Sequence, residues 1–135
     1  MIFLEKSYED VRYIIRKLHI KIAFLNIEDN GYAIVENNLI VIKNTISEEK
    51  KLMVILHELG HFIHKEDVAL YCRTYAAHQK AEHNANYYMI ECLLEWYASV
   101  SGIDMKDINY CDFAKMFNLN MENVKRVIKD CIYLE

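Results

Sequence analysis

Apolar residues near the start of the chain recur every three or four positions, which is the spacing of one face of a helix. The pattern follows Ser7-Tyr8-Glu9-Asp10, in which the serine and the acidic residues can cap the first turn of a helix. The apolar positions are Val11, Ile14, Ile15 and Leu18. We therefore predict a first amphipathic helix in this part of the chain.

Three shorter β-prone stretches come next, at Ile20–Ile27, Tyr32–Glu36 and Leu39–Lys43. The sequences Asp29-Asn30-Gly31 and Asn37-Asn38 separate them, and both favour tight turns. Consecutive strands joined by short turns can pair with one another, so we predict a small three-stranded antiparallel sheet. We also expect the third strand to offer an open edge to which an extended peptide can add as a further strand.

The clearest helical pattern runs from Glu48 to Lys65. Ser47 can accept a hydrogen bond from the first turn, and the acidic residues that follow it suit the positive end of the helix dipole. A stripe of apolar residues with helical spacing predicts the face that packs on the core: Leu52, Ile55, Leu56, Leu59 and Ile63.

The second half of the chain is predicted to be helical. A helical pattern extends from Ala81 to Ser101 and Gly102 supplies a stop, whereas residues 66–80 show no clean period and are expected to form a loop or a short helix. Two short helices are predicted at Cys111–Phe117 and Met121–Ile132. This pair superficially resembles a helix-turn-helix, but its basic residues are offset by acidic ones, so we interpret it as core packing.

Length and composition indicate one domain that spans residues 1–135. The formal net charge is −4, and the basic and acidic residues are spread along the chain, so the sequence has no basic region that would bind nucleic acid or an anionic membrane. We therefore expect a protein partner and no direct nucleic-acid or membrane binding. The four cysteines lack the spacing of a disulfide framework or a zinc ribbon, which favours thiols and a reducing compartment. No signal peptide or run of about 18 apolar residues is present, so we expect a soluble cytoplasmic protein.

The candidate chemistry lies inside the strongest predicted helix, in His57-Glu58-Leu59-Gly60-His61. Histidines at i and i+4 project from one helical face and can bind the same zinc ion, while the glutamate between them can act as a general base on a water at the metal. This HExxH arrangement is typical of zinc peptidases. The alternative is a buried helix with two hydrogen-bonded histidines and a surface glutamate, which is costly inside so apolar a segment.

A catalytic zinc ion needs a third protein ligand and an open position. Our candidate is Glu82, near the start of the next helix, where a crossing of the two helices can direct it at the metal. Asn86 lies one turn later and can accept the second ring N–H of a ligand histidine. Other possible ligands remain, and His83 is the main substitute because it adjoins Glu82; the others are His64, Asp67 and His78.

These residue types predict hydrolysis of a peptide bond by water, with Glu58 taking the proton of the water and returning it to the leaving amine. A further donor to the tetrahedral oxyanion is expected. The available side chains, among which the sequence does not choose, are Tyr75, His78, His83 and Tyr87.

The HExGH sequence at His57–His61, followed by Glu82-His83-Asn84-Ala85-Asn86 and an aromatic pair, resembles the ImmA/IrrE family of small bacterial and phage metallopeptidases. With the first helix and the strands, the resemblance covers roughly residues 8–100. It implies an α+β, zincin-like fold with an N-terminal helix, a small three-stranded antiparallel sheet, the HExxH helix and further C-terminal helices. It also implies a thermolysin-like site with His57, His61 and Glu82 as zinc ligands and Glu58 as the catalytic acid/base.

The resemblance further implies a zinc endopeptidase that cleaves a helix-turn-helix repressor and so relieves repression of a mobile element, a prophage or stress genes. The alternative is a non-catalytic antirepressor that sequesters its partner stoichiometrically, with zinc as a structural element. Glu58 favours the peptidase, because a purely structural zinc site has no use for a base. A DNA-binding regulator that uses the C-terminal helices is disfavoured by the acidic balance of the chain.

Overall fold

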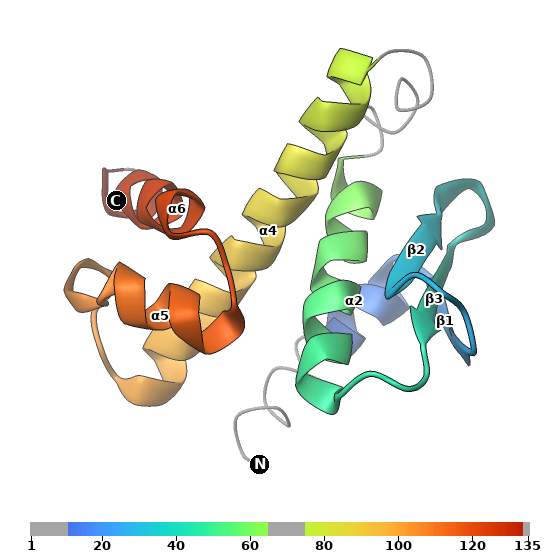
Figure 1. Cartoon of the computed structure of the whole chain (residues 1–135), viewed down its shortest axis with the longest axis horizontal. Coiled ribbons are helices and arrows are strands. Elements are labelled where there is room, and N and C mark those ends of the chain that lie inside the picture. The colour runs from blue at the N-terminus through green and yellow to red at the C-terminus, as the bar shows by residue number, and fades with distance from the viewer. Residues whose placement is uncertain (1–10, 65–74, 134–135) are drawn as a thin grey trace. The chain divides into compact units, whose positions relative to one another are not determined.

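The computed structural model describes residues 11–64 and 75–133. Residues 11–17 form a helix, as predicted, while the proposed cap at Ser7 lies outside the described residues. A sheet of strands β1, β2 and β3 and the helices α2, α4, α5 and α6 follow along the chain (Figure 1). The fold class is therefore α+β, as predicted.

The sheet is mixed, and the prediction of an antiparallel sheet is wrong. The strand order is β1-β3-β2, where β1 comprises Lys21–Leu25, β2 Gly31–Ile34 and β3 Leu39–Lys43. Strand β3 pairs antiparallel with β2 and parallel with β1. The short 3-10 helix η1, at Val35–Asn37, joins β2 to β3.

The central position of β3 has a physical reason. Its three middle residues, Ile40, Val41 and Ile42, are at most 2% exposed, whereas β1 and β2 contain no buried residue. The most apolar strand therefore lies between the other two, and β1 cannot pair with β2. Since both edges of β3 are paired, the expectation that it offers an open edge to a peptide is also wrong.

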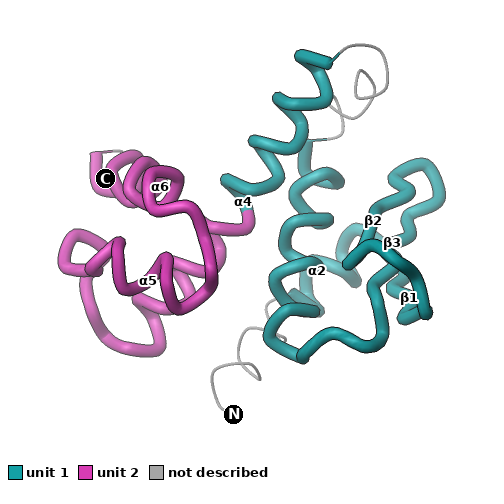
Figure 2. The backbone as a smooth tube through the Cα atoms, viewed as in Figure 1, with its two compact units in different colours: residues 1–88 teal, residues 89–135 magenta. Residues whose placement is uncertain are grey.

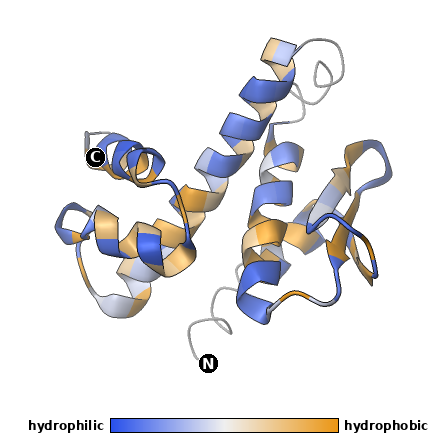
Figure 3. Ribbon diagram, in the orientation of Figure 1, coloured by the Kyte–Doolittle hydropathy of each residue, from blue (hydrophilic) through white to orange (hydrophobic). Residues whose placement is uncertain are grey.

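Helix α2 spans Glu48–Ile63 and begins as the sequence predicts. The side chain of Ser47 accepts a hydrogen bond from the backbone N–H of Lys50 over 3.2 Å. The helix packs against β2 and β3, and hydrophobic and hydrophilic residues alternate along it (Figure 3). Four of the five predicted core positions are buried, but Ile63, in the last turn, is 47% exposed.

Helix α4 spans Tyr75–Ser101 and so begins six residues before the predicted start. The residues expected to form a loop or short helix are therefore helical at 75–80, and residues 65–74 lie outside the described part of the chain. The helix ends at Gly102, as predicted, where φ is +75° and the backbone N–H donates to the carbonyl of Ala98.

The remaining elements form a small helical unit. The 3-10 helix η2 (Met105–Asp107) precedes α5 (Tyr110–Phe117) and α6 (Met121–Tyr133). Asn118, with φ of +54°, makes the turn between α5 and α6. These two helices pack together, and their buried residues include Phe113, Phe117, Val124 and Val127. The predicted helix pair is therefore present, and these four residues belong to its core.

The chain divides into two compact units, Met1–Tyr88 and Met89–Glu135 (Figure 2). The boundary falls inside α4, where the backbone remains helical. The single domain expected from the sequence stays a prediction. No described helix has the length and apolar character needed to cross a membrane.

Candidate metal centre

Helix α2 places three polar side chains of the HExxH sequence in an otherwise apolar segment. His57 and His61, one turn apart, have ring centroids 5.1 Å from each other and ring planes at 89°. Among the residues that the structure describes, the buried polar ones are Glu58 and His61, at 6% and 7% exposure. The helical period thus brings both imidazoles to one face, as predicted.

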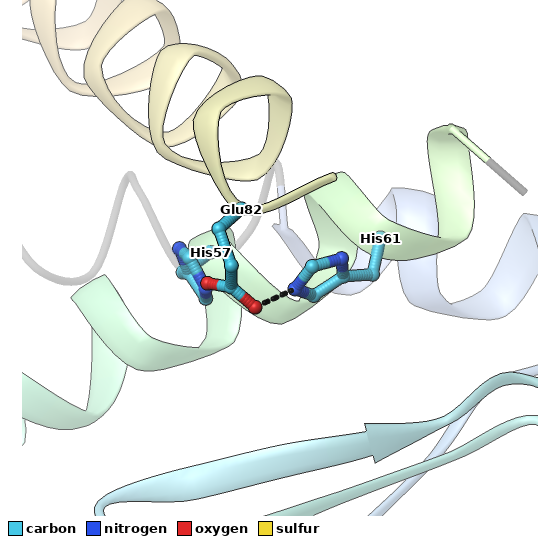
Figure 4. Close-up of side chains that lie close together, drawn as sticks. All are labelled: His57, His61 and Glu82. Carbon is cyan, nitrogen blue, oxygen red and sulfur yellow. Dashed lines mark hydrogen bonds and ion pairs between the residues drawn. The ribbon is translucent and has the colours of Figure 1, made fainter. Parts of the chain in front are cut away.

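Helix α4 supplies the third side chain of the site. The carboxylate of Glu82 lies between the two imidazoles (Figure 4). Its Oε2 is 3.1 Å from Nε2 of His57, and its Oε1 is 3.3 Å from Nε2 of His61. All three residues belong to the unit Met1–Tyr88. The predicted set of two histidines and one glutamate is therefore assembled in space.

The donor set has the composition and spacing that a metal ion requires. One potential ligand atom from each of the three side chains lies within 4.8 Å of the others. Tetrahedral zinc, with bonds of about 2.0–2.1 Å to nitrogen and oxygen, separates its ligand atoms by about 3.3–3.4 Å. Nε2 of His57 and Nε2 of His61 lie 3.1 and 3.3 Å from the two oxygens of the Glu82 carboxylate, so the types of these ligand atoms and their proximity fit a zinc site.

The alternative ligands lie elsewhere. His83 is exposed although it adjoins Glu82, and His64 is the C-cap residue of α2. His78 is half-buried on the first turns of α4, and Asp67 lies outside the described residues. Within residues 11–64 and 75–133, the group that brings three potential ligands together is the one formed by His57, His61 and Glu82.

Glu58 lies in an environment that suits a proton acceptor. Burial raises the pKa of its carboxyl group above the ordinary value, and the charge of Glu82 adds to this rise. Positive charge on His57 and His61 lowers the pKa of Glu58, but the effect of burial is larger, so the pKa is raised overall. A carboxylate with a raised pKa takes up a proton more readily, which is the property required of a general base.

Asn86 lies on α4 one turn after Glu82, and its side chain affects the pKa of His57. Burial by itself would lower the pKa of His57, but the hydrogen bond to Glu82, the charges of Glu58 and Glu82 and a hydrogen bond to the Asn86 side chain raise it overall. The hydrogen bond to Asn86 is the smallest of these causes. An acceptor at this place can fix the orientation of the imidazole.

The four candidates for an oxyanion donor all lie on α4. Tyr75 is 80% exposed and His83 is exposed, whereas His78 and Tyr87 are half-buried. The choice of a donor stays a prediction.

Sequence reasoning missed one pair of residues at the site, Gly60 and Ala85. The backbones of α2 and α4 meet where these two residues lie. Small residues beside the ligands were a signal that could have indicated a close crossing of helices.

Comparison with known proteins agrees with this geometry. The family model of the IrrE N-terminal-like domain, a peptidase family, matches residues 15–125, which is more than half of the chain. Neither the search of curated proteins nor that of solved structures gave a match. The matched segment contains His57, Glu58, His61 and Glu82. The chain therefore belongs to the IrrE N-terminal-like family of peptidases, which confirms the resemblance to ImmA/IrrE proteins noted in its sequence.

Proposed function

We propose that this protein is a zinc-dependent endopeptidase. The observation that carries the proposal is the convergence of His57, His61 and Glu82 next to the buried carboxyl group of Glu58. Two nitrogens and one oxygen are the protein ligands of many catalytic zinc sites, and they leave a position open for water or substrate. Membership of a peptidase family supports the same chemistry.

In the proposed mechanism, His57, His61 and Glu82 would hold the zinc ion, which would supply Lewis acidity toward the scissile carbonyl group and water. Glu58 removes a proton from the water as its oxygen attacks the carbonyl carbon. The carboxyl group then donates this proton to the leaving amine as the C–N bond breaks, and so returns to its starting state. Asn86 keeps the His57 imidazole oriented by the hydrogen bond between their side chains.

The substrate that we propose is a helix-turn-helix repressor, whose cleavage would relieve repression of a mobile element, a prophage or stress genes. This part of the proposal comes from the resemblance to the ImmA/IrrE family, as does a cytoplasmic place of action. A stoichiometric antirepressor that binds the same partner without cleaving it is the second candidate. The buried base favours cleavage, because sequestration of a partner needs no proton acceptor at the metal.

The experiment compares wild-type protein with Glu58→Gln, using repressors encoded beside its gene as substrates. We expect wild-type protein to cleave one of them in a reaction that a chelator stops. Glu58→Gln should retain about one zinc per chain and bind the partner, but cleave it at least about 100-fold more slowly, since a general base contributes a factor of this order. If Glu58→Gln relieves repression in cells to the same extent as wild type, the antirepressor hypothesis is correct and the peptidase hypothesis is wrong.

A further inference from the structure

Helices α2 and α4 approach each other closely where Gly60 faces Ala85. A Cβ atom built on Gly60 would lie 2.7 Å from Cα, 3.1 Å from the carbonyl oxygen and 3.2 Å from Cβ of Ala85. The first of these atoms belongs to the backbone of α4, so no side-chain rotation can relieve the contact. Glycine within a helix is less favourable than alanine, and the close approach to Ala85 gives a reason for glycine at position 60.

The crossing lies between the polar residues of the site on both helices. On α2, Gly60 is three residues after His57 and directly before His61. On α4, Ala85 is three residues after Glu82 and directly before Asn86. The side chains that can hold the metal, and the one that orients a histidine, therefore all lie within one turn of the point of contact.

The metal centre tolerates little change in the distance between the helices. Glu82 reaches His57 and His61 over 3.1 and 3.3 Å, and metal–ligand distances vary by only about 0.2 Å among well-formed sites. An alanine at position 60 needs its Cβ at ordinary contact distance from Ala85, 3.4 Å or more, where the present backbones allow 2.7 Å. The difference of 0.7 Å must be met by separation or sliding of the helices.

We propose that Gly60 and Ala85 are positioning residues, which set the distance between α2 and α4 at which Glu82 completes the metal centre. This inference rests on the proposed metal-dependent function. Neither residue has a side chain that can bind a metal ion. They act through Glu82, which the close crossing holds within reach of both imidazoles.

Gly31 provides a matched steric control. A Cβ on Gly31 would lie 2.6 Å from Cγ1 of Val54 and 2.9 Å from the carbonyl oxygen of Val41, so this substitution, like that at Gly60, brings Cβ within 3.0 Å of a backbone atom. This contact lies between β2, β3 and α2 and includes none of the metal-holding side chains. A general loss of packing should therefore affect both glycine variants, whereas a loss of positioning should affect Gly60→Ala alone.

The test measures zinc affinity by competition with a chelator, the visible absorption of the cobalt(II)-substituted protein, and the thermal unfolding midpoint of the metal-free protein. We expect Gly60→Ala to bind zinc about 10- to 100-fold more weakly, the range found when groups that orient a metal ligand are removed, with an altered cobalt spectrum. Gly31→Ala should lower the unfolding midpoint and leave zinc affinity and the cobalt spectrum of the folded protein unchanged.

Ala85 gives a second variant in case Gly60→Ala does not fold. Ala85→Val adds bulk to the crossing from the other helix and should also weaken zinc binding. Wild-type affinity in folded Gly60→Ala or Ala85→Val would overturn the inference, as would equal losses of affinity in Gly60→Ala and Gly31→Ala. If wild-type protein itself binds neither zinc nor cobalt, the proposed metal-dependent function fails instead.

Discussion

Glu82 joins the two helices of the site, because its carboxylate interacts with both imidazoles of α2. The sequence left two neighbouring candidates for the third ligand, Glu82 and His83. A difference of one residue rotates a side chain by about 100° around a helix, so the two cannot face the same ion. The structure places Glu82 in the cluster and exposes His83 to solvent.

Replacement of these two residues should have opposite outcomes. We expect Glu82→Ala to lose most of its zinc, because two histidines alone form an incomplete site. His83→Ala should retain about one zinc per chain, as wild-type protein should. Metal analysis after gel filtration gives the stoichiometry. Full zinc content in Glu82→Ala together with loss of zinc in His83→Ala would reverse the assignment.

Asn86 should matter for metal affinity although it is not a ligand. Loss of an acceptor that orients a ligand histidine typically costs about 10- to 100-fold in metal affinity or activity, and we expect this from Asn86→Ala. The matched control is Asn84→Ala, since Asn84 is a half-buried asparagine on the same helix two residues earlier. Chelator competition and the stability of the metal-free protein separate a site effect from a folding defect. Unchanged affinity and activity in Asn86→Ala would exclude the orienting role.

Glu58 should make the metal-free protein less stable as the pH rises. Because burial raises the pKa of this group in the folded state, folded protein holds a proton that unfolded protein has already lost. Stability therefore falls as the pH rises from the ordinary glutamate pKa, about 4.3, through the raised value. We expect metal-free Glu58→Gln to resist urea better than wild type at pH 7 and equally well below about pH 4. This account would be contradicted if wild type and Glu58→Gln had the same urea midpoint as each other at pH 7 as well as below pH 4.

Among the elements, α2 could be predicted well and the sheet could not. The residues of α2 carry their own helical period, cap and stripe, all of which are local signals. The pairing of strands depends on which strand is buried between two others, and turn residues do not determine this. Asn37-Asn38 correctly marked the turn between β2 and β3, which pair antiparallel. The segment between β1 and β2 does not form a tight hairpin, because β3 lies between these two strands in the sheet.

The site shows the same division between local and non-local information. His57, Glu58 and His61 follow from the period of one helix. Glu82 could be proposed from its place on the next helix and from the resemblance to a family, but its contact with both imidazoles needed the structure. Small residues beside the ligands hinted at a close crossing, but the pairing of Gly60 with Ala85 needed the structure, because it depends on the distance between two helix backbones.

The cap of α2 should contribute measurably to stability. The Ser47 side chain accepts a hydrogen bond from the N–H of Lys50, and loss of such a cap typically costs about 1 kcal/mol. We expect Ser47→Ala to lower the urea midpoint accordingly. Ser47→Asp keeps a capping oxygen and should stay close to wild type. If both variants are equally unstable, the side chain of Ser47 acts by some means other than capping.

At the scale of the whole molecule, the three side chains that can hold a metal lie in the unit Met1–Tyr88, and the chain's single tryptophan lies in the other. Trp96 is 7% exposed, so its fluorescence should change when the unit Met89–Glu135 unfolds. Because α4 continues through the boundary between the units, the single-domain prediction requires both to unfold in one transition.

Zinc should therefore raise the unfolding midpoint measured by Trp96 fluorescence, although the three described residues that can bind the metal all lie in the other unit, Met1–Tyr88. A metal present at 100 times its Kd stabilises the folded state by about 2.7 kcal/mol if unfolded protein does not bind it. We expect the fluorescence of Trp96 and far-ultraviolet circular dichroism to give the same upward shift. Glu82→Ala, which lacks the third ligand, should show little shift with either probe. A shift in circular dichroism without one in Trp96 fluorescence would mean that the two units unfold independently, and the chain would then have two domains.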